Sequence, residues 1–335
     1  MIVLKDLSIG YKSKRNTHVV ASGINARIRG GELTCLLGTN GVGKSTFLRT
    51  LAGFQPKING KIYVDNRELE QYTERELAQK ISVVLTDRID IHNLSTQELI
   101  SMGRSPYTGF WGTLNEEDHD VVQQAIQLVG IENLAQHMVH TLSDGERQKA
   151  MIAKALVQQT PIVLLDEPTA FLDFPSKVEI MQLLHRLSRE TGKTIFLSTH
   201  DLEIALQMAD KVWLMSPTND IVAGTPEDLA LDGALDNFFS RQGIIFDQQS
   251  GLFRVKHSTH RKIHLEGKGL RLMMLHKALL RNGIDGSENP SSSISIHVAD
   301  DKFNLYLNNQ PHASFHNIEE TLVELLDLIG KQNFS

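Results

Sequence analysis

Residues 33–46 read LTCLLGTNGVGKST, and this stretch decides the fold of the chain. Its apolar first part, Leu33–Leu37, predicts a buried strand, and the following Ser45–Leu51 predicts a helix. The turn between them has the pattern G-x-x-x-x-G-K-[ST], in which glycine lets successive backbone N–H groups curl around an anion. We therefore expect a phosphate-binding loop, with the N-terminus of the helix pointing at the phosphates.

Two carboxylates, Asp166 and Glu167, follow a second apolar run, Ile162–Leu165. A short continuous apolar run is typical of a parallel strand covered on both faces. Open α/β sheets bind ligands at the carboxyl ends of their strands, which is where these two carboxylates fall. We expect Asp166 to hold Mg²⁺, directly or through water, with the hydroxyl of Ser45, and Glu167 to accept a proton from the attacking water.

A third motif, residues 142–148 (LSDGERQ), lies between the other two in the sequence. Ser143 is a capping residue that opens a predicted helix, and the free N–H groups at a helix N-terminus form an anion site. The three motifs in this order resemble the ATP-binding cassette (ABC) ATPases. The resemblance covers about residues 1–255 and implies a P-loop α/β fold of the ABC type that hydrolyses ATP.

The resemblance implies an ATP site that two copies of the chain build together. In this family two ATP molecules are clamped between two head-to-tail cassettes, and hydrolysis releases the clamp. One copy contributes the phosphate loop, and the other contributes the helix N-terminus of the third motif. The residues implied for ATP are Tyr11, Gly38, Asn40, Gly41, Gly43, Lys44, Ser45 and Thr46 from one copy, with Ser143, Gly145 and Glu146 from its partner.

The resemblance also assigns the catalytic residues, which are Lys44, Glu167 and His200. His200 closes the predicted strand Thr194–Leu197 and corresponds to the switch histidine of the family. Tyr11 resembles the aromatic residue that stacks on adenine, although a tyrosine at a strand end can equally serve packing. Residues 170–173 (AFLD) stand where these ATPases carry the loop that communicates between their two nucleotide sites.

Two positions depart from the family pattern. Asp144 replaces a glycine and places an acid near a phosphate site, where it could cap the helix instead. Thr86 ends the predicted strand Ile81–Leu85 in place of a glutamine that touches Mg²⁺ and the attacking water. The threonine hydroxyl reaches the metal only if a water bridges the gap, so metal sensing and coupling would work differently here.

Residues 102–112 (MGRSPYTGFWG) resemble a stretch found in importer ATPases for iron-siderophore, haem and cobalamin. This resemblance implies two permease subunits as membrane partners and, indirectly, an extracytoplasmic substrate-binding protein. The groove around Thr86–Trp111 would receive a coupling helix of the permease, with Phe110 or Trp111 as buried anchors. The alternative is an ordinary loop of the subdomain.

Composition indicates where the chain works. Its 335 residues are 41% hydrophobic, which suffices for a large core, but no apolar run approaches the length of a membrane span. The N-terminus lacks a secretory signal, and the single cysteine, Cys35, suits a reducing compartment. The net charge of −6 provides no basic patch for nucleic acid. We expect a soluble protein bound peripherally to the cytoplasmic face of the cell membrane.

Beside the parallel core, the sequence predicts two further parts of the ATPase domain. Met1–Ile9, Gly23–Ile28 and Gly60–Val64 suggest an antiparallel β layer. Residues 87–160 suggest a helical subdomain, in which Asn115 starts a helix with three acidic residues in its first turn and Gly130 ends it.

Residues 256–335 predict a small accessory α/β domain. Its expected elements are a helix at Gly269–Asn282, a loop at Ser287–Ser293, a hairpin of Ile294–Val298 with Phe303–Leu307, and a capped helix at Asn317–Ile329. Seven of the 14 histidines lie here, but their spacing matches no metal-ligand motif. We expect this domain to help pair or restrain the cassettes.

The leading functional hypothesis is the ATPase subunit of an importer, in which two chains bind two MgATP and drive two permease subunits. One alternative is a soluble ABC-type ATPase acting on ribosomes or nucleic acid. A second is a slow regulatory nucleotide binder, which Thr86 and Asp144 favour and which Glu167 and His200 oppose. The sequence does not identify the cargo, because the permease and the binding protein recognise it.

Overall fold

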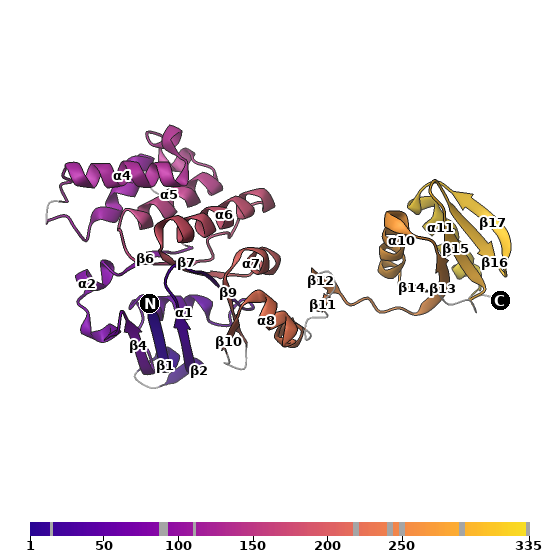
Figure 1. Ribbon diagram of the computed structural model, residues 1–335, viewed down its shortest axis with the longest axis horizontal. Coiled ribbons are helices and arrows are strands. Elements are labelled where there is room, and N and C mark those ends of the chain that lie inside the picture. The colour runs from indigo at the N-terminus through magenta and orange to yellow at the C-terminus, as the bar shows by residue number, and fades with distance from the viewer. Residues whose placement is uncertain are drawn as a thin grey trace. The chain divides into compact units, whose positions relative to one another are not determined.

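The computed structural model describes residues 1–13, 16–86, 93–109, 112–216, 221–239, 244–247, 252–287 and 292–332. The chain divides into two compact units, coloured indigo to orange and orange to yellow in Figure 1. The first unit comprises residues 1–242 and 246–253, and the second comprises residues 254–335 with 243–245. None of the described helices is long and apolar enough to cross a membrane.

A six-stranded sheet with the order β10-β9-β3-β8-β7-β6 forms the centre of the first unit. Five neighbouring strands are parallel, and β10 pairs antiparallel at the edge. Every residue of β3, β7 and β8 is buried, as expected for parallel strands covered on both faces. The strands are β3 (Leu33–Leu37), β6 (Ile81–Val84), β7 (Ile162–Asp166), β8 (Thr194–Thr199), β9 (Lys211–Met215) and β10 (Ile221–Gly224).

Helix α1 (Lys44–Leu51) is held against the sheet by an aromatic cluster. Phe47 on α1 lies 6.0 Å from Phe196 on β8 and 5.9 Å from Trp213 on β9, measured between ring centroids. All three side chains are almost fully buried. The cluster therefore fixes the start of α1, and with it the loop that enters the helix.

A four-stranded antiparallel sheet of order β2-β1-β4-β5 lies beside α1, as the sequence predicted. Its strands are β1 (Ile2–Lys12), β2 (Thr17–Ile28), β4 (Asn59–Val64) and β5 (Arg67–Glu68). Their apolar side chains share one core with Phe47 and with the central strands. The short helices η1 (Leu69–Gln71) and α2 (Glu74–Ala78) lead from this layer to β6.

The helical part of the first unit lies above the sheet in Figure 1. Asn115 caps α4 and Gly130 ends it with a positive φ of 69°, so both predicted ends are confirmed. The helices here are α3 (Thr96–Ser101), η2 (Met102–Arg104), α4 (Glu116–Val129), η3 (Glu132–Leu134), η4 (Val139–Thr141) and α5 (Asp144–Leu156).

Residues 102–112, which resemble the importer stretch, connect these helices through hydrogen bonds of Arg104. Arg104 is buried, and its Nε donates to Oδ1 of Asp118 on α4 at 2.7 Å. Its Nη1 donates to the carbonyl of Val157, just after α5, at 2.9 Å. A Cβ on Gly103 would lie 2.2 Å from the carbonyl oxygen of Lys154, so only glycine allows this approach. The predicted anchors Phe110 and Trp111 lie outside the described residues.

The remaining helices of the first unit follow the central strands. Helix α6 (Phe174–Thr191) is capped by Asp173 and ends at Gly192, while α7 (Leu202–Met208) follows β8. Near the boundary of the unit lie α8 (Pro226–Leu231), α9 (Ala234–Phe239) and a two-stranded sheet of β11 (Ile244–Asp247) and β12 (Leu252–Val255).

The second unit is a five-stranded sheet of order β14-β13-β15-β16-β17 with two helices against one face. The predicted hairpin and both helices are confirmed. Strands β13, β14 and β17 were not predicted, and Ser287 ends β14 instead of starting a loop. The elements are β13 (Arg261–Glu266), α10 (Gly269–Arg281), β14 (Ile284–Ser287), β15 (Ile294–Val298), β16 (Phe303–Leu307), β17 (Gln310–Phe315) and α11 (Ile318–Gln332).

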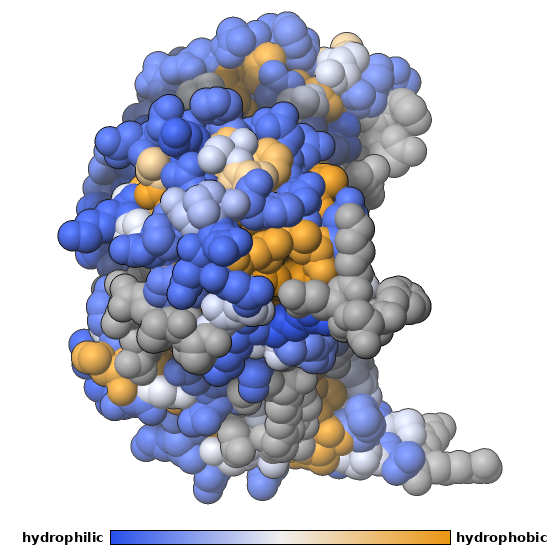
Figure 2. Space-filling view, turned by 90° about the vertical axis from the view of Figure 1, so that its right-hand side faces the viewer, coloured by the Kyte–Doolittle hydropathy of each residue, from blue (hydrophilic) through white to orange (hydrophobic). Residues whose placement is uncertain are grey.

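Hydrophilic side chains dominate the face shown in Figure 2, where hydrophobic ones gather in a few patches. Each unit also contains a cluster of buried apolar side chains. Each unit therefore has its own core, which is what an independently folding domain requires.

Candidate functional site

The loop from Gly38 to Gly43 leaves the end of β3 and enters α1 with glycines where a side chain would not fit. Gly43 has a φ of 112°, and a Cβ there would lie 2.1 Å from Cγ1 of Val20. Gly41 also has a positive φ, of 79°. Asn40 and Gly41 are exposed, so the loop is open to solvent at its tip. Its backbone conformation suits a phosphate-binding loop.

The three predicted catalytic side chains lie together at the end of the central strands. Lys44 is 5% exposed, and its Nζ lies 3.3 Å from Oε1 of Glu167 and donates to the Gly38 carbonyl at 2.9 Å. Nδ1 of His200 lies 3.4 Å from the other carboxylate oxygen of Glu167. Glu167 itself has a φ of 47°, a strained conformation for a residue with a side chain.

A buried serine that sequence reasoning did not single out contacts both Asp166 and Glu167. The hydroxyl of Ser198 donates to Oδ1 of Asp166 at 2.6 Å and accepts from the backbone N–H of Glu167 at 2.9 Å. Ser198 is fully buried, and it pairs with Asp166 across the parallel strands β7 and β8. The signal in the sequence was a hydroxyl residue two positions before His200.

The residues expected to hold Mg²⁺ fit that role. Asp166 is 5% exposed, and among the described residues its Oδ2 accepts no hydrogen bond. Ser45 is exposed at the start of α1. Thr86, which follows β6, donates its hydroxyl hydrogen to the carbonyl of Asp166 at the end of β7, at 2.7 Å. The lone pairs of the Thr86 hydroxyl oxygen remain available to a ligand at this end of the sheet. A carboxylate and hydroxyl oxygens are ligands that Mg²⁺ accepts, usually with several waters.

Tyr11 lies near the end of β1 and is 54% exposed as a residue. Its hydroxyl is 2.8 Å from Oγ1 of Thr46 on α1, so the antiparallel sheet contacts the helix of the phosphate loop here. An exposed aromatic face beside that loop is suited to stacking against a base.

The third motif forms a complete helix cap. Ser143 accepts from the N–H of Glu146, and the Glu146 carboxylate accepts from the Ser143 N–H at 2.9 Å and from its hydroxyl at 2.8 Å. The backbone hydrogen bond from Ser143 is the main reason that the pKa of Glu146 is lowered. Asp144 does not take the cap position; it lies in the first turn, 3.6 Å from Arg147.

The third motif is separate from the phosphate loop of its own chain. Within the described ranges, no hydrogen bond or ion pair joins Ser143, Gly145 or Glu146 to Gly38–Thr46. Gly145 has room for a side chain, since a Cβ there would lie 3.6 Å from the nearest atom, Oγ of Ser176. Packing inside this chain therefore does not require a glycine at 145.

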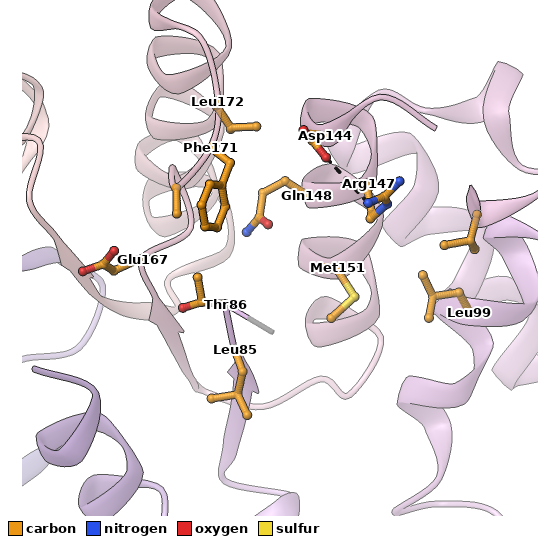
Figure 3. A pocket seen from close by; sticks show the side chains of 12 residues that line it. Leu85, Thr86, Leu99, Asp144, Arg147, Gln148, Met151, Glu167, Phe171 and Leu172 are labelled. Carbon is orange, nitrogen blue, oxygen red and sulfur yellow. Dashed lines mark ion pairs between the residues drawn. The ribbon is translucent and has the colours of Figure 1, made fainter. Parts of the chain in front are cut away.

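A small pocket lies between the catalytic strand ends and helix α5. Figure 3 shows Thr86, Glu167 and Phe171 on one side and Gln148 and Met151 of α5 on the other. Phe171 is 71% exposed and has a φ of 65°. The loop after β7 thus reaches from Glu167 toward the helical part of the unit.

Asp201, the residue after His200, is held by two side chains. It accepts from the hydroxyl of Thr169 at 2.7 Å and pairs with Nζ of Lys177 on α6 at 2.8 Å. Burial alone would raise the pKa of Asp201, but the hydrogen bonds from Lys177 and Thr169 outweigh it and lower the pKa. The charged form of Asp201 therefore holds the end of β8 in place.

Comparison with known families gives two matches. Residues 21–170 match the family model of ABC transporters, and residues 260–326 match the model of the iron ABC transporter C-terminal domain. The first match contains the phosphate loop and both carboxylates, and the second falls within the second structural unit.

Curated relatives and solved structures agree with these matches. An uncharacterized ABC transporter ATP-binding protein of Methanocaldococcus jannaschii is 35% identical, over 77% of this chain and 88% of the relative. The ferric enterobactin transport ATP-binding protein of Escherichia coli is 32% identical, over 72% and 88% of the two chains. A dimeric ATP-binding cassette, MJ0796, in a post-hydrolysis state with ADP and phosphate, aligns with a TM-score of 0.59 and 27% identity, over 68% of this chain and 99% of that one.

Proposed function

Because the chain belongs to the ATP-binding proteins of ABC transporters, we propose that it is the ATPase subunit of an importer for iron-siderophore complexes. The family resemblance expected from the three motifs is thus confirmed, and the chain binds and hydrolyses ATP. Two findings support iron-siderophore as the cargo class. A relative carries ferric enterobactin in its name, and residues 260–326 match a domain described from iron ABC transporters.

The observation that carries the hydrolytic function is the cluster of Lys44, Glu167 and His200. In this proposal Glu167 accepts the proton of the attacking water. His200, whose Nδ1 lies 3.4 Å from Oε2 of Glu167, holds that carboxylate or a phosphate oxygen. Lys44 can move from Glu167 to the phosphates, where its charge stabilises the transition state. Ser45, Asp166 and Thr86 would hold Mg²⁺, and the ion would supply positive charge to neutralise the phosphates.

Two copies of the chain would complete each ATP site. In this arrangement Ser143, Gly145 and Glu146 of one copy face the phosphate loop of the other. The separation of the third motif from the phosphate loop of its own chain supports the arrangement. Gly145 supports it too, because packing within this chain does not require a glycine there, whereas a glycine lets the ATP bound by the partner approach the backbone. The similar MJ0796 cassette is itself dimeric.

The pair of cassettes would sit on the cytoplasmic face of the membrane against two permease subunits. The pocket between Glu167 and α5 supports a coupling route, because it lies where the catalytic carboxylate meets the helical subdomain. An extracytoplasmic binding protein would deliver the cargo to the permease. Residues 1–255 would form the ATPase domain and residues 256–335 an accessory domain.

A transport assay in the native cell tests this proposal. A strain lacking the protein is complemented with the wild-type chain or with Glu167→Gln, and uptake of ⁵⁵Fe-siderophore is compared with uptake of labelled haem and cobalamin. We expect only the wild-type chain to restore ⁵⁵Fe-siderophore uptake. Glu203→Gln, which changes an exposed glutamate on α7, is the matched control and should behave as wild type.

The partners are tested by affinity purification of the Glu167→Gln chain from detergent-solubilised membranes with MgATP. We expect a polytopic permease in the eluate, and its absence when the bait is Lys44→Ala. Recovery of ribosomal or nucleic-acid components without a membrane protein would overturn the importer proposal in favour of a soluble ATPase. Restored uptake of cobalamin or haem alone would overturn the cargo assignment.

A further inference from the structure

The sheet of the second unit gathers two histidines and a glutamate that are far apart in the sequence. Strands β13 and β15 are parallel neighbours, with Glu266 opposite His297 and His264 opposite Ser295. Successive side chains of a strand point to opposite faces, so His264, Glu266 and His297 share one face. Leu265 and Ile296 between them point to the buried core on the other face.

The three side chains are close enough to hold one ion. One ligand atom from each of His264, Glu266 and His297 lies within 4.8 Å of the other two. Nε2 of His297 is 3.2 Å from Oε2 of Glu266. Ligands at about 2.1 Å from a tetrahedral ion are about 3.4 Å apart, so this pair already has the required spacing.

The surroundings of these histidines favour a bound ion and restrict the rotation of one imidazole ring. Nδ1 of His264 is buried and makes no hydrogen bond among the described residues. A buried nitrogen without a partner costs free energy, which an ion bound through that nitrogen would offset. The ring of Tyr306 on β16 packs against His297 with centroids 4.6 Å apart and limits its rotation.

We propose that His264, Glu266 and His297 bind a divalent first-row transition-metal ion such as Zn²⁺ or Fe²⁺. Two imidazole nitrogens and one carboxylate suit these metals, whereas Mg²⁺ and Ca²⁺ prefer all-oxygen sites. The ligands stand on adjacent strands packed against a core, so their backbone positions are set before the ion arrives. Glu266 is exposed, which leaves an entry path and room for water as a further ligand. The proposal does not depend on the transport function.

A second pair in the same unit provides an internal control. Nε2 of His312 on β17 lies 2.8 Å from Oε1 of Glu324 on α11, an even closer contact than that of His297 with Glu266. Within the described part of the chain, the His312 pair belongs to no group of three potential ligands. If proximity of histidine to glutamate were sufficient, both places would bind metal equally.

Titration of the full chain with metal tests the proposal. The purified protein is stripped with a chelator and titrated, without nucleotide, with Zn²⁺ by calorimetry and with Co²⁺ by visible absorption. We expect one high-affinity ion per chain, with Co²⁺ bands typical of mixed nitrogen and oxygen ligands. His264→Ala and His297→Ala should each weaken binding by about 100-fold or more, since even indirect partners of a metal ligand contribute 10–100-fold.

The isosteric variant Glu266→Gln should also weaken binding, and His312→Ala should leave it unchanged. Circular dichroism confirms that each variant is folded before it is titrated. Absence of a stoichiometric site in the wild-type chain would overturn the proposal. So would a site that survives both histidine substitutions or one that is lost equally in His312→Ala, because either result would place the ion elsewhere.

Discussion

The hydroxyl of Ser198 lies 2.6 Å from Oδ1 of Asp166 and joins the ends of two parallel strands. The same oxygen accepts the backbone N–H of Glu167, so one fully buried group orients the expected Mg²⁺ ligand and the expected base together. Ser198 can thus influence hydrolysis by positioning Asp166 and Glu167, the expected Mg²⁺ ligand and the expected base.

We expect Ser198→Ala to lower kcat for ATP hydrolysis by about 10-fold and to raise the Mg²⁺ concentration needed for half-maximal rate. A hydrogen bond to a charged group contributes about 1.5–3 kcal/mol, which corresponds to at least a tenfold change. The Mg²⁺ dependence distinguishes positioning from general destabilisation. Ser188→Ala removes a similarly buried hydroxyl, on α6, and should leave the Mg²⁺ dependence unchanged. An unaltered Mg²⁺ requirement in Ser198→Ala would contradict the positioning role.

Glu167→Gln should reduce ATP turnover by about 10²-fold or more while ATP binding persists. The amide keeps the size of the side chain but cannot accept the proton of water. Steady-state hydrolysis and equilibrium binding of a fluorescent ATP analogue measure the two effects. Turnover at the wild-type rate would show that another group is the base.

Gly43→Ala should weaken ATP binding by about 10-fold or more. The alanine must adopt a φ of 112° and its Cβ meets Val20, and such backbone strain costs about 1–3 kcal/mol. Gly130→Ala is the control, because Gly130 also has a positive φ but has open space around it and ends α4 away from the loop. That variant should lose about 1 kcal/mol of stability and no ATP affinity. Equal losses of affinity in both variants would refute the local explanation.

Arg104→Ala should destabilise the first unit by about 3–5 kcal/mol, because it leaves Asp118 buried without its charged partner. Urea denaturation monitored by circular dichroism measures the change. Lys149→Ala breaks the ion pair with the exposed Glu179 and should cost about 0–1 kcal/mol. A similarly small loss of stability in Arg104→Ala would show that the buried ion pair of Arg104 with Asp118 does not stabilise the first unit.

Acid should remove the stabilisation that Asp201 provides. Its pKa is lowered in the folded state, so the unfolded chain takes up the proton more readily. The contribution is present above the ordinary aspartate pKa of about 3.9 and is lost as pH falls through the lower, folded value. The urea midpoint of Asp201→Asn should therefore be below that of wild type at pH 7, and the gap should narrow below about pH 4. A gap independent of pH would contradict this linkage.

Local motifs could be predicted because their geometry depends on neighbouring residues. The glycines of the phosphate loop, the cap formed by Ser143 and Glu146, and the ends of α4 at Asn115 and Gly130 are all set within a few residues of backbone. The apolar runs of β3 and β7 were equally clear, because strands buried on both faces need uninterrupted apolar side chains.

Contacts across the fold could not be predicted in the same way. Arg104 and Asp118 are 14 residues apart, and nothing in the segment around Arg104 showed that it would be buried rather than presented to a partner. Strand β14 could not be predicted from the sequence, because Ile284–Ser287 contains a glycine and two polar residues. It is a strand only because it pairs with β13.

The sequence by itself determined the family, the phosphate loop, the two carboxylates and the helix cap, because each is written in consecutive residues with distinctive backbone requirements. Only the tertiary structure decided that Ser198 would orient Asp166 and that His264, Glu266 and His297 would share one face of a sheet. Those relationships depend on which strands pair and in which register. Strand pairing is settled by the burial of whole hydrophobic faces, which no short stretch of sequence contains.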